Sequence, residues 1–197
     1  MDAKRLFDII FSLIGIVCLI PVLVLVSILL IIDSAGPVFY TQVRVGLHLK
    51  YFRLVKFRTM CCGADAKGLL TVGKDTRITV FGAWLRRYKV DELPQLFNIL
   101  KGEMSFVGPR PEVPRYVDLY DEGQRRVLSV KPGITDWASI RYIEENELLA
   151  LAEDPEAFYI QTVLPSKIMQ NLEYVDHHDL WTDCKIISYT IKSIFIR

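Results

Sequence analysis

The sequence predicts an α+β protein that is mostly helical, with a long apolar N-terminal helix, a small β-hairpin and a helical domain. Three observations carry this prediction. No charged residue occurs from Ile9 to Ile32. Two runs rich in β-branched and aromatic residues follow, VFYTQVRV and YFRLVKF, joined through Gly46–Lys50. From about Thr79 onward, most segments carry the start and stop signals of helices.

Composition fits one modest domain attached to a membrane. The 197 residues are 51% hydrophobic and have a formal net charge of +1, which argues against a general nucleic-acid-binding protein. The four cysteines are Cys18, Cys61, Cys62 and Cys184. Their spacing is not that of a metal site, and free thiols fit a cytoplasmic location. We expect a membrane anchor over residues 1–36, and a catalytic domain with amphipathic interfacial helices over residues 37–197.

The charge-free stretch is long enough to cross a bilayer, for which about 20 apolar residues are needed. The flank Asp33–Pro37 does not read as a signal-peptide cleavage site, so we expect the segment to be retained. Pro21 removes a helix hydrogen bond near the middle and predicts a kink. Each arm of about 12 residues then measures roughly 18 Å, which reaches about the bilayer midplane.

Charge bears on how this helix sits in the membrane. Lys and Arg prefer the cytoplasmic side of membrane segments, and basic residues flank the stretch on both sides: Lys4 and Arg5 before it, and Arg44, Lys50, Arg53, Lys56 and Arg58 after it. A re-entrant hairpin with both ends on one side fits this pattern. From the residues alone, an ordinary kinked single pass fits equally well.

The segments after the anchor have local signals of their own. Alternation along the second strand puts Lys56 and Arg58 on one face of the hairpin. Cys62–Lys67 is expected to form a short helix or turn. A helix is predicted from about Thr79, as a cap, to Tyr88, where it ends in basic residues.

The stretch Asp91–Glu112 reads DELPQLFNILKGEMSFVGPRPE. We expect Asp91 to be the N-cap of a helix that tolerates Pro94 in its first turn and stops at Gly102. A helix start carries partial positive charge, which keeps an acid ionised and attracts anions. Basic residues lie on both sides, namely Arg86, Arg87, Lys89 and Arg110. The combination suggests a carboxylate nucleophile acting on a phosphate; a capped helix followed by a rigid turn is the alternative.

The rest of the chain reads as further helices. Short helices are expected at 112–120 and 122–128, a turn at 131–133, and longer helices at 144–152 and 155–174. The segment 179–197 is an amphipathic helix. It lies either on the membrane surface or, as we slightly prefer, in the core of the domain.

Seven motifs, taken in order, closely resemble those of a bacterial sugar transferase family, the small monotopic phosphoglycosyl transferases. They are KRLFD, the kinked apolar helix, GPVFYTQVRVG, KFRTM, DTRIT..G..LRR, the Asp91–Glu112 stretch and KPGIT. The match runs from Lys4 to about Trp137, and more weakly through D.KII..T at 183–190. Each motif is weak alone, whereas seven in order at family-like spacing are highly specific.

The resemblance implies an enzyme of the bacterial inner (cytoplasmic) membrane with a re-entrant anchor and its catalytic domain on the cytoplasmic face. It implies transfer of a phosphosugar from a UDP-sugar to a polyprenyl phosphate, with release of UMP, as the first membrane step of glycoconjugate or polysaccharide synthesis. Asp91 would be the nucleophile that forms an aspartyl-phosphosugar, and Glu92 the second acid. Magnesium is implied, held by Asp91 and Glu92, without a decision between them. A homodimer is kept as an open alternative.

Further residues match family positions that bind substrate: Lys56, Arg58, Arg86, Arg110 and Asp183. The sequence departs from the common pattern after Thr135, where GITDWASIRYIEENELL replaces GITGWAQVNGR, and this puts the sugar and nucleotide contacts in question. Two other functions remain open. One is a transferase that moves the sugar alone and releases UDP, and the other is a membrane scaffold without activity.

Overall fold

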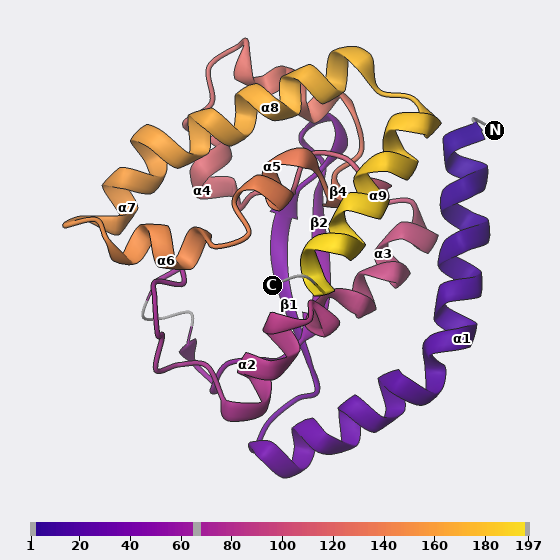
Figure 1. Cartoon of the computed structure of the whole chain (residues 1–197), viewed down its shortest axis with the longest axis vertical. Coiled ribbons are helices and arrows are strands. Elements are labelled where there is room, and N and C mark those ends of the chain that lie inside the picture. Colours follow the sequence, from indigo (N-terminus) through magenta and orange to yellow (C-terminus); the bar gives the residue numbers. More distant parts are fainter. Residues whose placement is uncertain (1–2, 65–67, 196–197) are drawn as a thin grey trace.

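The computed structural model describes residues 3–64 and 68–195 and has the mostly helical α+β architecture that the sequence predicts (Figure 1). Its two small sheets are an antiparallel hairpin and a parallel pair of strands. Figure 1 shows the hairpin in the middle of the molecule, with the long N-terminal helix along one side. Residues 65–67 and 196–197, which belong to the predicted Cys62–Lys67 turn and to the predicted C-terminal helix, lie outside the described residues.

The N-terminal helix α1 (Ala3–Asp33) is bent into two arms, as Pro21 predicts (Figure 1). It is the one helix among the described residues that is long and apolar enough to cross a membrane. Only 11% of its most apolar 18-residue window is buried, so it is not a core helix of the domain. Ile16 packs toward Leu96, while Val26 and Leu30 pack with Phe57. Asp8 and Ser12 are also buried, whereas many large apolar side chains of α1 are exposed.

The predicted hairpin is confirmed. Strand β1 (Phe39–Val45) pairs antiparallel with β2 (Tyr51–Phe57), through a one-turn helix η1 (Leu47–Leu49). The side chain of Asn98 fixes the hairpin to the helical layer, because it accepts from Val55 N (3.1 Å) and donates to Arg53 O (2.8 Å). The hairpin is therefore anchored directly against the segment that follows the acid pair.

That segment begins differently from the prediction. Helix α2 (Val80–Arg87) is capped by Thr79 as expected, and α3 (Leu96–Lys101) ends at Gly102, whose φ is +89°. Between them lies a 3-10 helix, η3 (Val90–Gln95), whose N-cap is Lys89 in the left-handed conformation. The expectation that Asp91 is the N-cap is wrong. Because the chain already turns at Lys89, Asp91 lies inside the first turn.

Two strands were missed by the sequence reasoning. Strand β3 (Ser105–Val107) pairs in parallel with β4 (Gly133–Thr135), so the predicted turn at 131–133 gives way to a strand at Gly133. The backbones come very close here, since a Cβ on Gly133 would lie 2.2 Å from Gly108 N. This pairing places the Gly108–Pro111 turn beside the residues that follow β4.

The remaining helices pack around a second core. The predicted short helices and the long pair are confirmed, with a π-helical turn inside the second long one, whereas α5 (Trp137–Arg141) was not predicted. The other helices of this part are α4 (Pro114–Val117), η4 (Gln124–Ser129), α6 (Glu145–Ala150), α7 (Pro155–Phe158), η5 (Tyr159–Val163), α8 (Leu164–His177) and α9 (Leu180–Phe195). Helix α9 is amphipathic, with Ile186 buried and Trp181 and Phe195 exposed. It therefore combines a core face with an apolar outer face.

Candidate functional site

A polar cavity of about 300 Å³ gathers most of the predicted site residues. Its walls come from the hairpin, the end of α2, η3, the Gly108–Pro111 turn and the segment after β4. Five predicted residues line it: Lys56, Arg86, Asp91, Glu92 and Arg110. The fold thus brings together acids and bases that are up to 54 positions apart in the sequence.

Asp91 is buried in this cavity, and its Oδ1 has no hydrogen-bond partner. Burial, followed by the negative charge of Glu92, raises the pKa of Asp91 above its ordinary value, while Lys56 and Lys89 oppose the rise. A buried carboxylate oxygen without a partner is costly unless a ligand uses it. Asp91 therefore has the placement of a reactive or cation-binding group.

Glu92 is committed to Arg110. The guanidinium donates from both terminal nitrogens to the two carboxylate oxygens, at 2.6 and 3.3 Å. Burial opposes the charge of Glu92, but the positive charges of Arg110 and Lys89 outweigh it and hold the pKa of Glu92 well below its usual range. The side chain of Arg110 remains 37% exposed, so it is still accessible to an anion from the cavity.

Asp136 fixes the position of Arg110, a role that sequence reasoning did not assign. Its Oδ2 accepts from Arg110 N at 2.9 Å, while Oδ1 caps α5 through Ser139 N. Asp136 is fully buried. Two features of the sequence could have drawn attention to Asp136, namely its departure from the family pattern and the preference of aspartate for helix N-caps. The link to Arg110 required the β3–β4 pairing.

Lys56 and Arg86 form a cationic wall of the cavity that also holds the acid pair. Lys56 Nζ lies 5.2 Å from the ring centroid of Tyr40, and no carboxylate pairs with it among the described residues. Burial, and then the charge of Arg86, lower the pKa of Lys56 to about 8. Arg86 donates to the hydroxyls of Thr59 (2.8 Å) and Thr71 (3.1 Å). Lys56 and Arg86 therefore bring positive charge to the cavity without forming a salt bridge to an acid among the described residues.

Two predicted residues lie elsewhere. Arg58 donates to Ser34 O (2.6 Å) and Ala35 O (2.7 Å), the backbone that follows α1. Asp183 is buried on the other side of β3, where it pairs with Lys4 and accepts from Tyr174 Oη at 2.7 Å. The structure thus places both beside the two ends of α1 instead of in the cavity that holds Asp91.

The segment after Thr135, where the sequence departs from the family pattern, lines the far part of the cavity. Its contributors are Ser139, Tyr142, Ile143, Glu145 and Asn146. Ser139 Oγ is a buried hydroxyl without a hydrogen-bond partner. Arg44, which was not predicted as a site residue, also lines the cavity, and its Nη1 lies 3.6 Å from Glu112 Oε2. The divergent residues therefore surround the same space as the acid pair.

An apolar groove of about 260 Å³ opens onto the opposite side of the Glu92–Arg110 pair. It lies between η3, the β3–β4 pair, α5 and the end of α9. Apolar side chains dominate its walls: Leu93, Leu96, Phe106, Ile134, Ile140, Ile143 and Ile194. Lys89, Glu92 and Arg110 line both the groove and the polar cavity. One charged pair therefore borders a polar and an apolar compartment.

The acid pair fits a magnesium site with few protein ligands. Mg²⁺ is usually bound by one or two carboxylates together with substrate phosphates and water. Asp91 Oδ1 is a buried oxygen without a partner, while both oxygens of Glu92 already accept from Arg110. No group of three or more potential ligands occurs in the described ranges. A metal here would therefore depend on phosphate oxygens from a substrate.

Comparisons with known proteins agree with this site. A model of the bacterial sugar transferase family matches residues 1–197. The chain is 39% identical to an undecaprenyl-phosphate glucose phosphotransferase of Komagataeibacter xylinus, over 100% of the chain and 37% of that protein. It is equally 39% identical to the uncharacterized sugar transferase EpsL of Bacillus subtilis, over 100% of the chain and 89% of that protein.

A further relative is the UDP-glucose:undecaprenyl-phosphate glucose-1-phosphate transferase of Escherichia coli, which is 34% identical over 98% of the chain and 40% of its own length. The chain spans about two fifths of the Komagataeibacter and Escherichia proteins and most of the Bacillus protein. The similarity is thus to a unit that occurs both within longer proteins and nearly by itself.

Proposed function

This chain belongs to the bacterial sugar transferase family, and from that premise we propose that it is a phosphoglycosyl transferase. It transfers a sugar phosphate from a UDP-sugar to a polyprenyl phosphate and releases UMP. The observation that carries the proposal is the meeting of a cationic cavity and an apolar groove at Glu92 and Arg110, next to Asp91. The water-soluble anionic donor would bind in the polar cavity and the lipid acceptor in the apolar groove, and both compartments border Glu92 beside Asp91. The names of the relatives support such a donor and acceptor.

The reaction proceeds in two displacements at one phosphorus. First, an Oδ of ionised Asp91 bonds to the β-phosphorus of the donor. The bond from that phosphorus to the oxygen bridging the two phosphates breaks, and its electron pair leaves with UMP. A phosphate oxygen of the acceptor then bonds to the same phosphorus, and the aspartyl oxygen departs as a carboxylate. Splitting the transfer in this way is ordinary covalent catalysis.

In this scheme, the other residues of the cavity neutralise the negative charge of the phosphates and hold one another in position. Lys56, Arg86 and Arg110 neutralise phosphate oxygens, which are the main source of charge in the transition state. Glu92 holds Arg110 in a fixed direction through its two hydrogen bonds. Magnesium, when bound by Asp91 or Glu92 with the phosphates, would neutralise further negative charge.

The product identifies the reaction. We expect one UDP-sugar from a panel to give UMP in an amount equal to the sugar phosphate transferred to polyprenyl phosphate. Release of UDP would instead establish transfer of the sugar alone. A folded, lipid-bound protein that releases neither nucleotide with any donor would support the scaffold alternative.

The anchor is proposed to be re-entrant. Arg5 donates to Ile99 O (2.6 Å) and Leu100 O (2.8 Å), so the start of α1 is attached to the domain. Arg58 attaches the other end through Ser34 O and Ala35 O. A helix with both ends on one domain has both ends on that domain's side of the bilayer, which we propose is the cytoplasmic side.

Labelling in intact cells tests this topology. With the native cysteines removed, Ala3→Cys is expected to resist a membrane-impermeant thiol reagent until the cells are opened, because the start of α1 faces the cytoplasm. Pro21→Leu should straighten the helix and raise the labelled fraction. Rapid labelling of Ala3→Cys from outside, without Pro21→Leu, would contradict the re-entrant anchor.

Donor binding is expected to weaken as pH rises through about 8, because Lys56 has its pKa lowered to about 8 and loses its charge above that value. The KM for the UDP-sugar should therefore increase with pH, while Lys56→Arg should flatten this dependence because arginine stays protonated. Lys101→Arg, at an exposed position, is the matched control. An identical pH profile in Lys56→Arg would contradict the role of Lys56 in donor binding.

Changes in the apolar groove should affect only the acceptor. Ile194→Asn is expected to raise the KM for a long-chain polyprenyl phosphate about tenfold, from the loss of roughly 1.5 kcal/mol of apolar burial. UMP release in a single turnover without acceptor should not change. Ile191→Asn, on the exposed face of the same helix, is the control. A slower first step with unchanged acceptor KM would contradict this assignment of the groove.

A further inference from the structure

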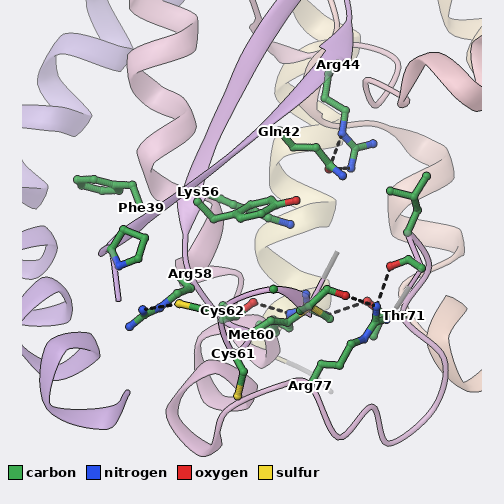
Figure 2. Close-up of a pocket in the computed structure, with 18 residues that line it drawn as sticks. Phe39, Gln42, Arg44, Lys56, Arg58, Met60, Cys61, Cys62, Thr71 and Arg77 are labelled. Atoms are coloured by element: carbon green, nitrogen blue, oxygen red, sulfur yellow. Dashed lines mark hydrogen bonds between the residues drawn. The ribbon is translucent and has the colours of Figure 1, made fainter. Parts of the chain in front are cut away.

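A second cavity lies next to the polar cavity, and Figure 2 shows the residues that line it. It measures about 230 Å³ and is enclosed by β1, the chain from Arg58 to Ala64, residues 68–71 and Arg77. The two cavities share part of their lining, which consists of Arg44, Lys56, Leu69, Thr71 and Arg86. Of these two cavities, only the first is lined by Asp91 and Glu92. The cationic wall of Lys56 and Arg86 therefore separates the acid pair from the second cavity.

We propose that this second cavity binds the nucleoside of the donor, and hence the departing UMP; the inference rests on the proposed function. In a displacement at phosphorus, the attacking and leaving oxygens lie roughly in line. Asp91 attacks from the first cavity, so UMP leaves on the side away from Asp91. With the diphosphate at the Lys56–Arg86 wall, that side is the second cavity, and the sugar phosphate stays in the first cavity with Asp91.

The lining of the second cavity suits a flat, uncharged polar group better than another phosphate. Two of its arginines are already committed. Arg58 donates to backbone carbonyls after α1, and Arg77 pairs with Asp75 at 2.6 Å. Thus the positive charge that remains for a substrate is concentrated at the wall shared with the first cavity. A phosphate is held at this wall. Beyond the wall, Arg77 is paired with Asp75, and the terminal nitrogens of Arg58 already donate to the backbone after α1.

Neutral groups for recognising a base are present in this lining. Phe39 and Tyr40 bring aromatic rings, on which nucleobases commonly stack. Gln42 accepts through Oε1 from Arg44 Nε (3.1 Å) and NH2 (2.6 Å), as the dashed lines in Figure 2 show. That contact fixes which atom of the amide faces Arg44 and leaves Nε2 as a donor. A pyrimidine carbonyl oxygen is a matching acceptor.

Two exposed thiols, Cys61 and Cys62, line this cavity and serve as built-in probes (Figure 2). In the full-length protein in lipid nanodiscs with Mg²⁺, saturating UMP is expected to slow alkylation of both thiols at least fivefold. Cys184, exposed on α9 and outside this cavity, is the internal control and should react at an unchanged rate. Inorganic phosphate at the same concentration should protect neither thiol, because it occupies only the wall.

Unchanged alkylation of Cys61 and Cys62 at a UMP concentration that inhibits turnover would overturn the proposal, because UMP would then bind elsewhere. Equal protection by phosphate would overturn it too, because the nucleoside would then add nothing. These binding results need no turnover. They are therefore separate from the nucleotide-release assay, in which UDP in place of UMP would overturn the proposed function itself.

A cavity-filling variant gives a second measurement. Cys61→Trp is expected to raise the KM for the UDP-sugar and the inhibition constant of UMP at least fivefold, with the acceptor KM unchanged. Cys184→Trp is the matched control and should behave as wild type. An unaltered UMP inhibition constant in Cys61→Trp that melts at the wild-type temperature would overturn the proposal.

Discussion

Replacing Asp91 with asparagine is expected to lower turnover by roughly a thousandfold or more, the order of loss seen when a covalent nucleophile is removed. The amide has nearly the same shape but cannot attack phosphorus. The steady-state rate of UMP release measures the effect. Asp118→Asn removes an exposed acid that does not line the cavity and should retain normal activity. Near-normal turnover in a verified Asp91→Asn preparation would exclude Asp91 as the nucleophile.

The same variant should be at least as stable as the wild type. Burial and Glu92 raise the pKa of Asp91, so its charged form is disfavoured in the folded protein. A raised acid pKa costs stability once pH exceeds the ordinary carboxyl range, and asparagine removes that cost. Asp91 also accepts no capping hydrogen bond that asparagine would weaken. The melting temperature at neutral pH is therefore expected to be unchanged or higher, which separates loss of chemistry from loss of fold.

Replacing Arg110 with alanine is expected to cost roughly 2 kcal/mol or more in kcat/KM for the UDP-sugar, the order of a charged hydrogen bond to an anion. Lysine keeps the charge but loses the planar fork, so Arg110→Lys should be impaired less. Arg115→Ala is the control, because Arg115 forms an exposed ion pair with Glu156. Donor kinetics and melting temperature should be measured on each variant.

Glu92 complicates this experiment, since Arg110→Ala also leaves a buried carboxylate unpaired. A double-mutant cycle with Glu92→Gln separates the two effects. If Arg110 binds phosphate, adding Arg110→Ala to Glu92→Gln should restore melting temperature relative to Arg110→Ala but still weaken donor kinetics. If Arg110 only pairs with Glu92, the second substitution should have no further effect on kinetics.

Local signals were sufficient for much of the fold. Thr79 caps α2, Gly102 stops α3, and the hairpin has the expected strands and connection, because each depends on residues close in sequence. The cap at Asp91 failed for an equally local reason. Lys89 adopts a left-handed conformation that glycine or asparagine usually takes, and this moved the helix start upstream.

Other features depend on contacts between distant segments. Strands β3 and β4 have three residues each, which is too short for periodicity to indicate, and their close approach depends on glycines 25 positions apart. The motif resemblance grouped Arg58 and Asp183 with the site residues. The structure places both beside the ends of α1, with Arg58 also in the lining of the second cavity, because a motif records which residues recur without recording what they contact.

The second cavity and the groove were not predicted. The walls of the second cavity come from the hairpin and the chain near Cys61, and those of the groove include α5 and α9. The sequence does not indicate which of these compartments a given charged residue lines. The role of Asp136 was not predicted either. Its departure from the family pattern suggested altered sugar contacts, whereas its side chain accepts a hydrogen bond from the backbone N–H of Arg110. Such assignments require the tertiary structure.

If donor and acceptor use the Asp91 carboxylate in turn, the intermediate between the two displacements is covalent, and intact-protein mass spectrometry can detect it. The enzyme is incubated with its UDP-sugar and Mg²⁺ in the absence of polyprenyl phosphate. We expect a mass increase of one sugar phosphate, located on Asp91 by peptide mapping, accompanied by UMP and removed when acceptor is added. An active enzyme that remains unmodified, and releases UMP only when acceptor is present, would exclude the aspartyl intermediate.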